Sequence, residues 1–204
     1  QAASLTPEGK KKLCQDIYDD SIWLLNLVEN LLSITRFDKG EIRIHKESES
    51  ISDVIEETLS HLGRKKENFN IVPIIDDENL YAKMDARLIV QVLINLIGNA
   101  VKYTPQGTDI TVQVKKEKTE NSQVIISVCD LGDGIPDDRK ERVFDMFYTG
   151  GNQVADSRRS LGLGLGLCRS IINAHGGKIW ISDNIPHGAV VTFTLPAEEV
   201  ALNE

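Results

Sequence analysis

Two asparagines, a lysine and a tyrosine form the first group whose residue types and spacing could do chemistry. Asn95 and Asn99 are four residues apart in an otherwise apolar stretch, and Lys102 and Tyr103 follow one helical turn later. Asparagine is a mediocre helix former, so two of them on one helical face need a reason. Amide oxygens suit Mg²⁺ that carries phosphates, and a lysine beyond them would meet those phosphates. The segment predicts a magnesium–phosphate site or, equally well on its own, a solvated stripe on a surface helix.

A carboxylate at the end of an expected strand forms the second group. Asp130 ends an apolar run and is followed by Gly132 and Gly134, which allow a tight turn. A buried carboxylate at this point could accept a hydrogen bond from the amino group of adenine. Asp-Gly turns are common in mixed folds, so this segment alone favours an ordinary turn.

Alternating glycines form the third group. Gly162, Gly164 and Gly166 lead into an expected helix, an arrangement in which backbone N–H groups and the helix dipole face a phosphate. The run is not a P-loop, because no Lys-Ser or Lys-Thr pair follows it, and it is not the dinucleotide-binding pattern, because residue 167 is leucine. The glycines therefore indicate phosphate binding, with simple backbone flexibility as the alternative.

The segment between these two groups combines aromatic residues with a polar loop. Phe144, Phe147 and Tyr148 lie close together in a chain with only 5% aromatic residues, and they favour a small core cluster beneath a loop. The polar stretch over 149–159 includes Arg158 and Arg159, and it is typical of a mobile lid over a binding site.

Hydrophobic periodicity predicts the elements that position these residues. A long helix over 6–39 carries a wide apolar stripe, which we expect to pack against another helix. Further helices are predicted over 51–62, 85–102 and 163–174, and strands over 41–45, 70–75, 79–83, 110–116, 123–129, 178–182 and 189–195. Strands and helices do not alternate strictly, so we expect an α+β fold: a two-layer sandwich with a mixed β-sheet covered by helices, preceded by the long N-terminal helix.

Composition narrows the class of protein. The 23 basic and 31 acidic residues leave a net charge of −8, which argues against nucleic acid as a partner. No apolar run approaches the roughly 20 residues of a membrane helix, so no membrane contact is expected within this chain. The N-terminus lacks a methionine and the features of a signal peptide, and we expect it to be a cut end. Three cysteines without metal-like spacing fit a reducing compartment.

The order of the four segments resembles the catalytic ATP-binding domain of sensor histidine kinases, which has the Bergerat fold shared with the gyrase, Hsp90 and MutL ATPases. Asn-x3-Asn-x2-Lys-Tyr, Asp-x-Gly-x-Gly, the Phe/Tyr cluster and Gly-x-Gly-x-Gly match that family's N, G1, F and G2 boxes. The resemblance covers 41–196, and 6–39 resembles the second helix of the dimerisation and phosphotransfer hairpin. It implies a partial hairpin over 1–39 and a catalytic domain over 40–204. The stretch 163–177 resembles the potassium-sensing kinases.

The resemblance also implies roles for single residues. Asn99 would coordinate Mg²⁺, and Asp130 would accept a hydrogen bond from the adenine amino group. The residues implied to bind ATP are Asn95, Asn99, Lys102, Tyr103, Asp130, Gly132, Gly134, Ile135, Phe144, Gly162, Leu163, Gly164, Leu165 and Gly166. Those implied to be catalytic are Asn95, Lys102, Arg158 and Arg159. The positions that depart from the family pattern, and bear on how the lid is anchored, are Leu131, Asp145, Met146 and Thr149.

Asn95 distinguishes the branches of this fold. The ATPase branches generally carry a glutamate base four residues before the metal-binding asparagine, whereas an amide cannot remove a proton at neutral pH. A neutral imidazole is already nucleophilic, so Asn95 favours transfer to a histidine and predicts slow ATP hydrolysis. The alternatives are a Bergerat-fold ATPase and a nucleotide-binding regulatory module that transfers nothing.

None of the histidines has the setting of a phosphate acceptor. They are interpreted as structural or surface residues: His45, His61, His175 and His187. We therefore expect a fragment that binds ATP and Mg²⁺ but does not label itself, with the acceptor histidine on a helix absent from this chain. The expected partners are that helix, within a kinase dimer, and a response regulator. Self-association through 6–39 and a location at the cytoplasmic end of a membrane-bound sensor are also expected.

Overall fold

The computed structural model describes residues 6–38, 44–62, 69–117, 122–149 and 162–198. In these ranges the helices are α1 (Pro7–Asp38), α2 (Ile51–His61), α3 (Ala86–Tyr103), α4 (Asp137–Lys140), η2 (Arg142–Phe144, a 3-10 helix) and α5 (Gly164–Ala174). The strands are β1 (Glu47–Ser50), β2 (Asn70–Ile75), β3 (Tyr81–Met84), β4 (Asp109–Glu117), β5 (Gln123–Cys129), β6 (Ile179–Asp183) and β7 (Ala189–Glu198). The expected mixed fold with a covered sheet is confirmed.

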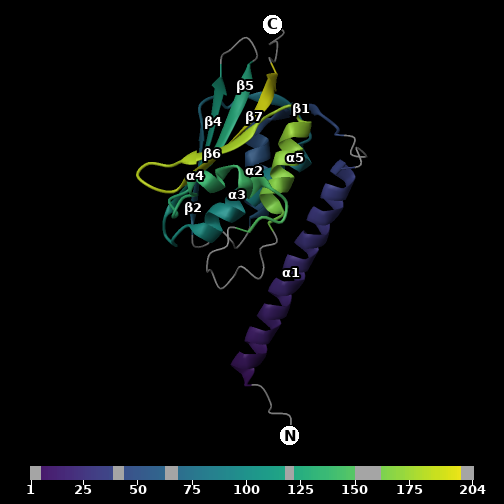
Figure 1. The fold of residues 1–204 in the computed structure, drawn as a ribbon, viewed down its shortest axis with the longest axis vertical. Helices are drawn as coiled ribbons and strands as arrows, with labels where there is room; N and C mark the ends of the chain where they lie inside the picture. The colour runs from purple at the N-terminus through teal and green to yellow at the C-terminus, as the bar shows by residue number, and fades with distance from the viewer. Residues whose placement is uncertain (1–5, 39–43, 63–68, 118–121, 150–161, 199–204) are drawn as a thin grey trace.

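The long N-terminal helix is present and reaches away from the rest of the chain (Figure 1). Thr6 caps it, because the Gly9 N–H donates to the Thr6 hydroxyl oxygen at 3.1 Å. One stretch of α1 contacts α5. Several of its large apolar side chains remain exposed, namely Leu13, Ile17, Tyr18, Leu24, Leu25 and Val28. None of the helices in the described ranges is long and apolar enough to cross a bilayer.

The sheet has the order β1-β3-β7-β5-β4-β2, and β6 also pairs with β7. β2 and β4 are parallel, and every other pair is antiparallel. β6 and β3 pair with successive parts of β7, since Phe193 pairs with Ile179 and Ala197 with Ala82. This arrangement brings the end of β5 beside the start of β7, where Cys129 pairs with Val190.

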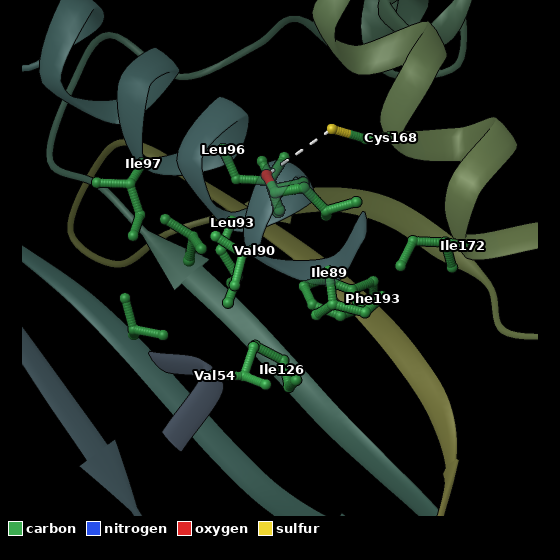
Figure 2. Packing of buried hydrophobic residues seen from close by; sticks show 14 of the residues in the cluster. Val54, Ile89, Val90, Leu93, Leu96, Ile97, Ile126, Cys168, Ile172 and Phe193 are labelled. Carbon is green, nitrogen blue, oxygen red and sulfur yellow. Dashed lines mark hydrogen bonds between the residues drawn. The ribbon is translucent and has the colours of Figure 1, made fainter. Parts of the chain in front are cut away.

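The core lies between the sheet and the layer of α2, α3 and α5 (Figures 1 and 2). α3 supplies much of it, because its apolar positions recur with the helical period, as the sequence predicts. Asp85 caps α3, and its carboxylate accepts from the Leu88 N–H at 3.4 Å. Packing of α3 against both α5 and the sheet holds its polar face next to the glycine-rich start of α5.

The structure differs from the sequence-based expectation at two places. The strand predicted over 41–45 is wrong at residues 44 and 45, and the strand found there is β1, which begins at Glu47. β1 has no apolar side chain and forms because it pairs with β3, Glu47 opposite Met84. The short helices α4 and η2 were not predicted, since a single turn is too short to show periodicity.

Candidate functional site

Asp130 directly follows β5, and one of its two carboxylate oxygens is already hydrogen-bonded to the protein. Its Oδ1 accepts hydrogen bonds from the Gly132 N–H at 2.9 Å and from the Ala189 N–H at 3.1 Å. Its own N–H donates to the Ala189 carbonyl at 2.9 Å. The residue is 9% exposed, and no group in the described ranges is recorded as donating to Oδ2. A pinned carboxylate with one unengaged oxygen is suited to accept from a ligand's amino group.

The glycines after Asp130 allow the loop to approach the end of α3. A Cβ at Gly132 would lie 2.5 Å from the Tyr103 carbonyl oxygen, closer than any side chain tolerates. Gly134 has φ +75°, and a Cβ there would lie 3.1 Å from the Gly188 carbonyl oxygen. The G1 segment and the end of the N segment, separated in sequence, are therefore in direct contact.

The two asparagines of α3 lie on the helix face that meets the start of α5. A Cβ at Gly164 would lie 3.8 Å from the side-chain amide of Asn95. The Asn95 Nδ2 is buried and makes no hydrogen bond within the described ranges. Asn99 follows one turn later on the same face and is half-buried. A buried amide next to a helix N-terminus, with only the weakly accepting Cys168 thiol beside it, is a polar group with capacity to bind a ligand.

Lys102 and Tyr103 lie at the solvent-exposed end of this helix face. The Lys102 ammonium lies 5.1 Å from the centre of the Tyr103 ring, a cation–π contact. Tyr103 is 54% exposed, so its ring and hydroxyl are open to a bound molecule. The four polar residues of the N segment thus run in one line from the buried start of α5 to the surface.

The start of α5 is joined to the aromatic segment. Gly162 has φ +65°, and a Cβ there would overlap the Tyr148 carbonyl oxygen. The Phe147 N–H donates to the Gly162 carbonyl at 3.0 Å. From this junction α5 begins at Gly164, so its unpaired N–H groups and positive dipole end face the Asn95 side of α3.

The remaining predicted site residues are placed as follows. Phe144 and Leu163 are core residues, 2% and 4% exposed, and offer a ligand little side-chain surface. Ile135 and Leu165 are partly buried against the core. Arg158 and Arg159, with all of the expected lid beyond Thr149, lie outside the described residues.

Cys168 lies under the site, in the contact between α5 and α3. Its thiol is within 3.9 Å of the Val92 carbonyl oxygen, the hydrogen bond drawn in Figure 2. Burial raises the pKa of this thiol to about 12, and the neighbouring Asn95 amide opposes that rise only in part. Cys168 is therefore a neutral packing residue near pH 7.

Three residues that the sequence analysis did not assign to the site also touch it. Asn184 and His187 donate to the main chain of the loop after β5, and Gly188 lies against it. In sequence, their stretch shows only a turn pattern with proline and glycine. Its involvement becomes visible only in the fold, where β7 pairs with β5 and so brings the turn between β6 and β7 beside Asp130.

The residues present fit a nucleotide with Mg²⁺. The described ranges contain no cluster of His, Cys, Asp and Glu that could hold a metal by itself. A magnesium ion here would therefore bind through the amide oxygen of Asn99 together with the phosphates of its nucleotide. The second carboxylate oxygen of Asp130 would contact the base of this nucleotide, and the Asn95 amide would lie beside its phosphates.

The sequence and the fold are similar to those of known proteins. Residues 84–199 match the family described as histidine kinase-, DNA gyrase B-, and HSP90-like ATPase. The chain is 39% identical to the sensor protein KdpD of Clostridium acetobutylicum over 93% of its length, and it spans 21% of that relative. It thus spans about a fifth of this curated relative.

Two solved structures have the same fold. The histidine kinase ThkA in complex with response regulator protein TrrA is 29% identical, with a TM-score of 0.69 over 95% of this chain and 53% of that one. Full-length ShkA in complex with AMPPNP is 23% identical, with a TM-score of 0.77 over 98% of this chain and 41% of that one. Because the family match covers more than half of the chain, this chain belongs to the histidine kinase-, DNA gyrase B- and HSP90-like ATPases, as a catalytic domain of the sensor histidine kinase type.

Proposed function

We propose that this chain binds Mg-ATP and transfers its γ-phosphate to a histidine on a helix outside the chain, as the catalytic part of a two-component sensor kinase. The observation that carries the proposal is the meeting of three segments: the pinned carboxylate of Asp130, the asparagine face of α3 and the glycine-rich start of α5. At one end, Asp130 Oδ2 can accept a hydrogen bond from the base. At the other end, the Asn95 amide can contact the phosphates.

Asp130 recognises the base in this proposal. Its Oδ1 is fixed by two backbone N–H groups, so Oδ2 is held in one place as an acceptor for the exocyclic amino group of adenine. Gly132 lets the loop after Asp130 pack directly against the Tyr103 carbonyl, so the carboxylate is held beside the end of α3. This end of the site sets which base is bound.

The phosphates belong at the other end. Asn99 holds Mg²⁺ through its amide oxygen, and Lys102 and the backbone N–H groups from Gly162 to Gly166 contact phosphate oxygens. When bound, the ion neutralises phosphate charge and so favours attack at the γ-phosphorus. Arg158 and Arg159 are proposed to reach the γ-phosphate from the lid.

Asn95 favours histidine as the acceptor. Its amide takes up no proton, so it cannot activate water or a hydroxyl group. A neutral imidazole nitrogen needs no such activation; it forms the N–P bond as the bond to the departing ADP oxygen breaks. A glutamate in place of Asn95 would have favoured hydrolysis instead.

The partners follow from this function. We propose a division at residue 39, with α1 as one helix of a dimerisation hairpin whose exposed apolar side chains meet a second helix. The ThkA–TrrA complex supports a response regulator as the downstream partner. The similarity to KdpD supports a sensor of the potassium-sensing type, with this part at its cytoplasmic end.

Calorimetric titration with a non-hydrolysable ATP analogue, with and without Mg²⁺, tests the proposal. We expect micromolar binding that weakens without Mg²⁺, and that loses its Mg²⁺ dependence in Asn99→Ala. Asn70→Ala is the matched control, because it removes an asparagine hydrogen bond to Asp109 on the edge strand β2, which β4 separates from β5. Transfer is then measured by adding ATP and a hairpin fragment that carries the acceptor histidine. Absence of binding would contradict the site, and ATP turnover without an acceptor would indicate an ATPase instead.

A further inference from the structure

The turn between β6 and β7 is fastened to the loop that follows Asp130. The Asn184 Nδ2 donates to the Asp130 carbonyl oxygen at 2.7 Å, and the His187 Nδ1 donates to the Gly132 carbonyl oxygen at 3.2 Å. A Cβ at Gly188 would overlap the same Asp130 carbonyl, so the two segments are in close contact. In Figure 1 this turn is the yellow loop beside α4. We call residues 184–188 the hairpin clasp.

Asn184 is itself held in one orientation. Its side-chain Oδ1 accepts from the Ile185 N–H at 2.9 Å, and its backbone N–H donates to the Gly188 carbonyl at 3.0 Å. Exchanging the amide oxygen and nitrogen would break both side-chain hydrogen bonds, because a carbonyl cannot donate and an N–H cannot accept. The Nδ2 is therefore a fixed donor aimed at Asp130.

The loop after β5 needs this support because the β-ladder ends at Cys129. Beyond that point the loop contains two glycines, whose backbones are intrinsically the least restricted. One main-chain hydrogen bond, from the Asp130 N–H to the Ala189 carbonyl, holds the N–H side of Asp130, and Asn184 holds its carbonyl side. The position of the carboxylate thus depends on groups of the hairpin clasp as well as on the strand.

We propose that Asn184 is a positioning residue for base selection: by holding the Asp130 main chain it places Oδ2 for the amino group of adenine, with His187 as a second anchor at Gly132. This inference rests on the proposed function, in which Asp130 recognises adenine. It predicts that loss of the Asn184 donor weakens the discrimination between bases and leaves the phosphate end unchanged.

Asn184→Asp is the most selective variant. It keeps the Oδ1 that accepts from Ile185, and so the turn, but replaces the donor to the Asp130 carbonyl with an oxygen. Asn184→Ala removes both side-chain bonds, and Asn70→Ala again serves as the control for loss of an asparagine hydrogen bond. Circular dichroism and thermal melting establish that each variant is folded.

The measurement compares two non-hydrolysable triphosphates, one with adenine and one with hypoxanthine, which has a carbonyl in place of the amino group. We expect Asn184→Asp to lower the affinity for the adenine nucleotide about fivefold to tenfold, as for one lost hydrogen bond, with little change for the other. Equal loss for both nucleotides, or no loss for either, would overturn the positioning role. Failure of the unaltered chain to bind the adenine nucleotide would instead overturn the proposed function, and this inference with it. If Asn184→Asp is unfolded, His187→Ala is compared in the same way, and unchanged selectivity there overturns the inference.

Discussion

Replacing Asp130 with asparagine should invert the base preference of the site. The two N–H groups of Gly132 and Ala189 both donate to Oδ1, so they require an oxygen at that position. In Asp130→Asn the amide oxygen must stay there, which puts the NH₂ group where Oδ2 stood. An acceptor that faces the ligand thereby becomes a donor, while the fold around it keeps its hydrogen bonds.

The size of the effect follows from this exchange. A hydrogen bond to a charged group contributes about 1.5–3 kcal/mol, and its loss lowers affinity roughly tenfold to a hundredfold or more. Two donors then face each other, so the adenine nucleotide loses at least this much. A hypoxanthine nucleotide gains a neutral hydrogen bond from the new NH₂ group, about 1 kcal/mol or roughly fivefold in affinity.

Competition binding with the two non-hydrolysable triphosphates measures both changes on one protein. Thermal melting checks that Asp130→Asn stays folded, and Asn70→Ala provides a baseline for an unrelated asparagine contact. If Asp130→Asn bound the adenine nucleotide within about twofold of the unaltered chain, Oδ2 would not contact the base, since even a neutral hydrogen bond is worth more than that. The assignment of the base to this end of the site would then be wrong.

Two further predictions concern stability. Gly188→Ala should lower the free energy of unfolding by more than about 2 kcal/mol and weaken nucleotide binding, because Gly188 has φ +109° and the new Cβ would overlap the Asp130 carbonyl. Urea unfolding measures the first effect, and titration with the nucleotide measures the second. Burial lowers the pKa of His175, and the opposing effects of the Ile171 carbonyl and the Asp85 carboxylate are smaller. In the fold, the His175 Nε2 accepts a hydrogen bond from the Asp85 N–H at 3.0 Å. The unfolded chain therefore binds a proton more readily, and the free energy of unfolding should fall as pH drops below the ordinary value of 6.5. Urea unfolding between about pH 7 and pH 5 should show this fall and a weaker pH dependence in His175→Leu; an identical pH dependence in the variant would contradict it.

Most of the fold was predictable because hydrophobic periodicity reports burial directly. The predicted bounds of β2 and β5 agree with the structure, and the residues that cap α1 and α2, Thr6 and Ser50, are of types that commonly precede a helix. β1 was missed because its Glu-Ser-Glu-Ser sequence has no apolar side. It is a strand only through its pairing with β3, which no local pattern contains.

The site residues likewise fall into two groups, those that a sequence motif reveals and those that only the folded structure reveals. Asp130 and the glycines carry their chemistry in their residue types, so a motif reveals them. Asn184 and His187 act on main-chain carbonyls 54 and 55 residues away in sequence, and every residue has such a carbonyl. Their acceptors therefore leave no mark in the sequence, and only the register of β5 with β7 brings them together.

The chemistry near the phosphate end explains why the chain should depend on its acceptor. Among the described residues, α3 and α5 bring together there the polar side chains of Asn95 and Cys168. The first has no proton to exchange near neutral pH, and the second keeps its proton because burial raises the thiol pKa to about 12. Neither can activate water, so in the proposed function a nucleotide bound beside Asn95 reacts only with a nucleophile that needs no base. A neutral imidazole meets that condition, and in the proposed function it belongs to a helix outside this chain. In the proposed function, slow hydrolysis and dependence on the acceptor helix thus have one cause, the amide at position 95.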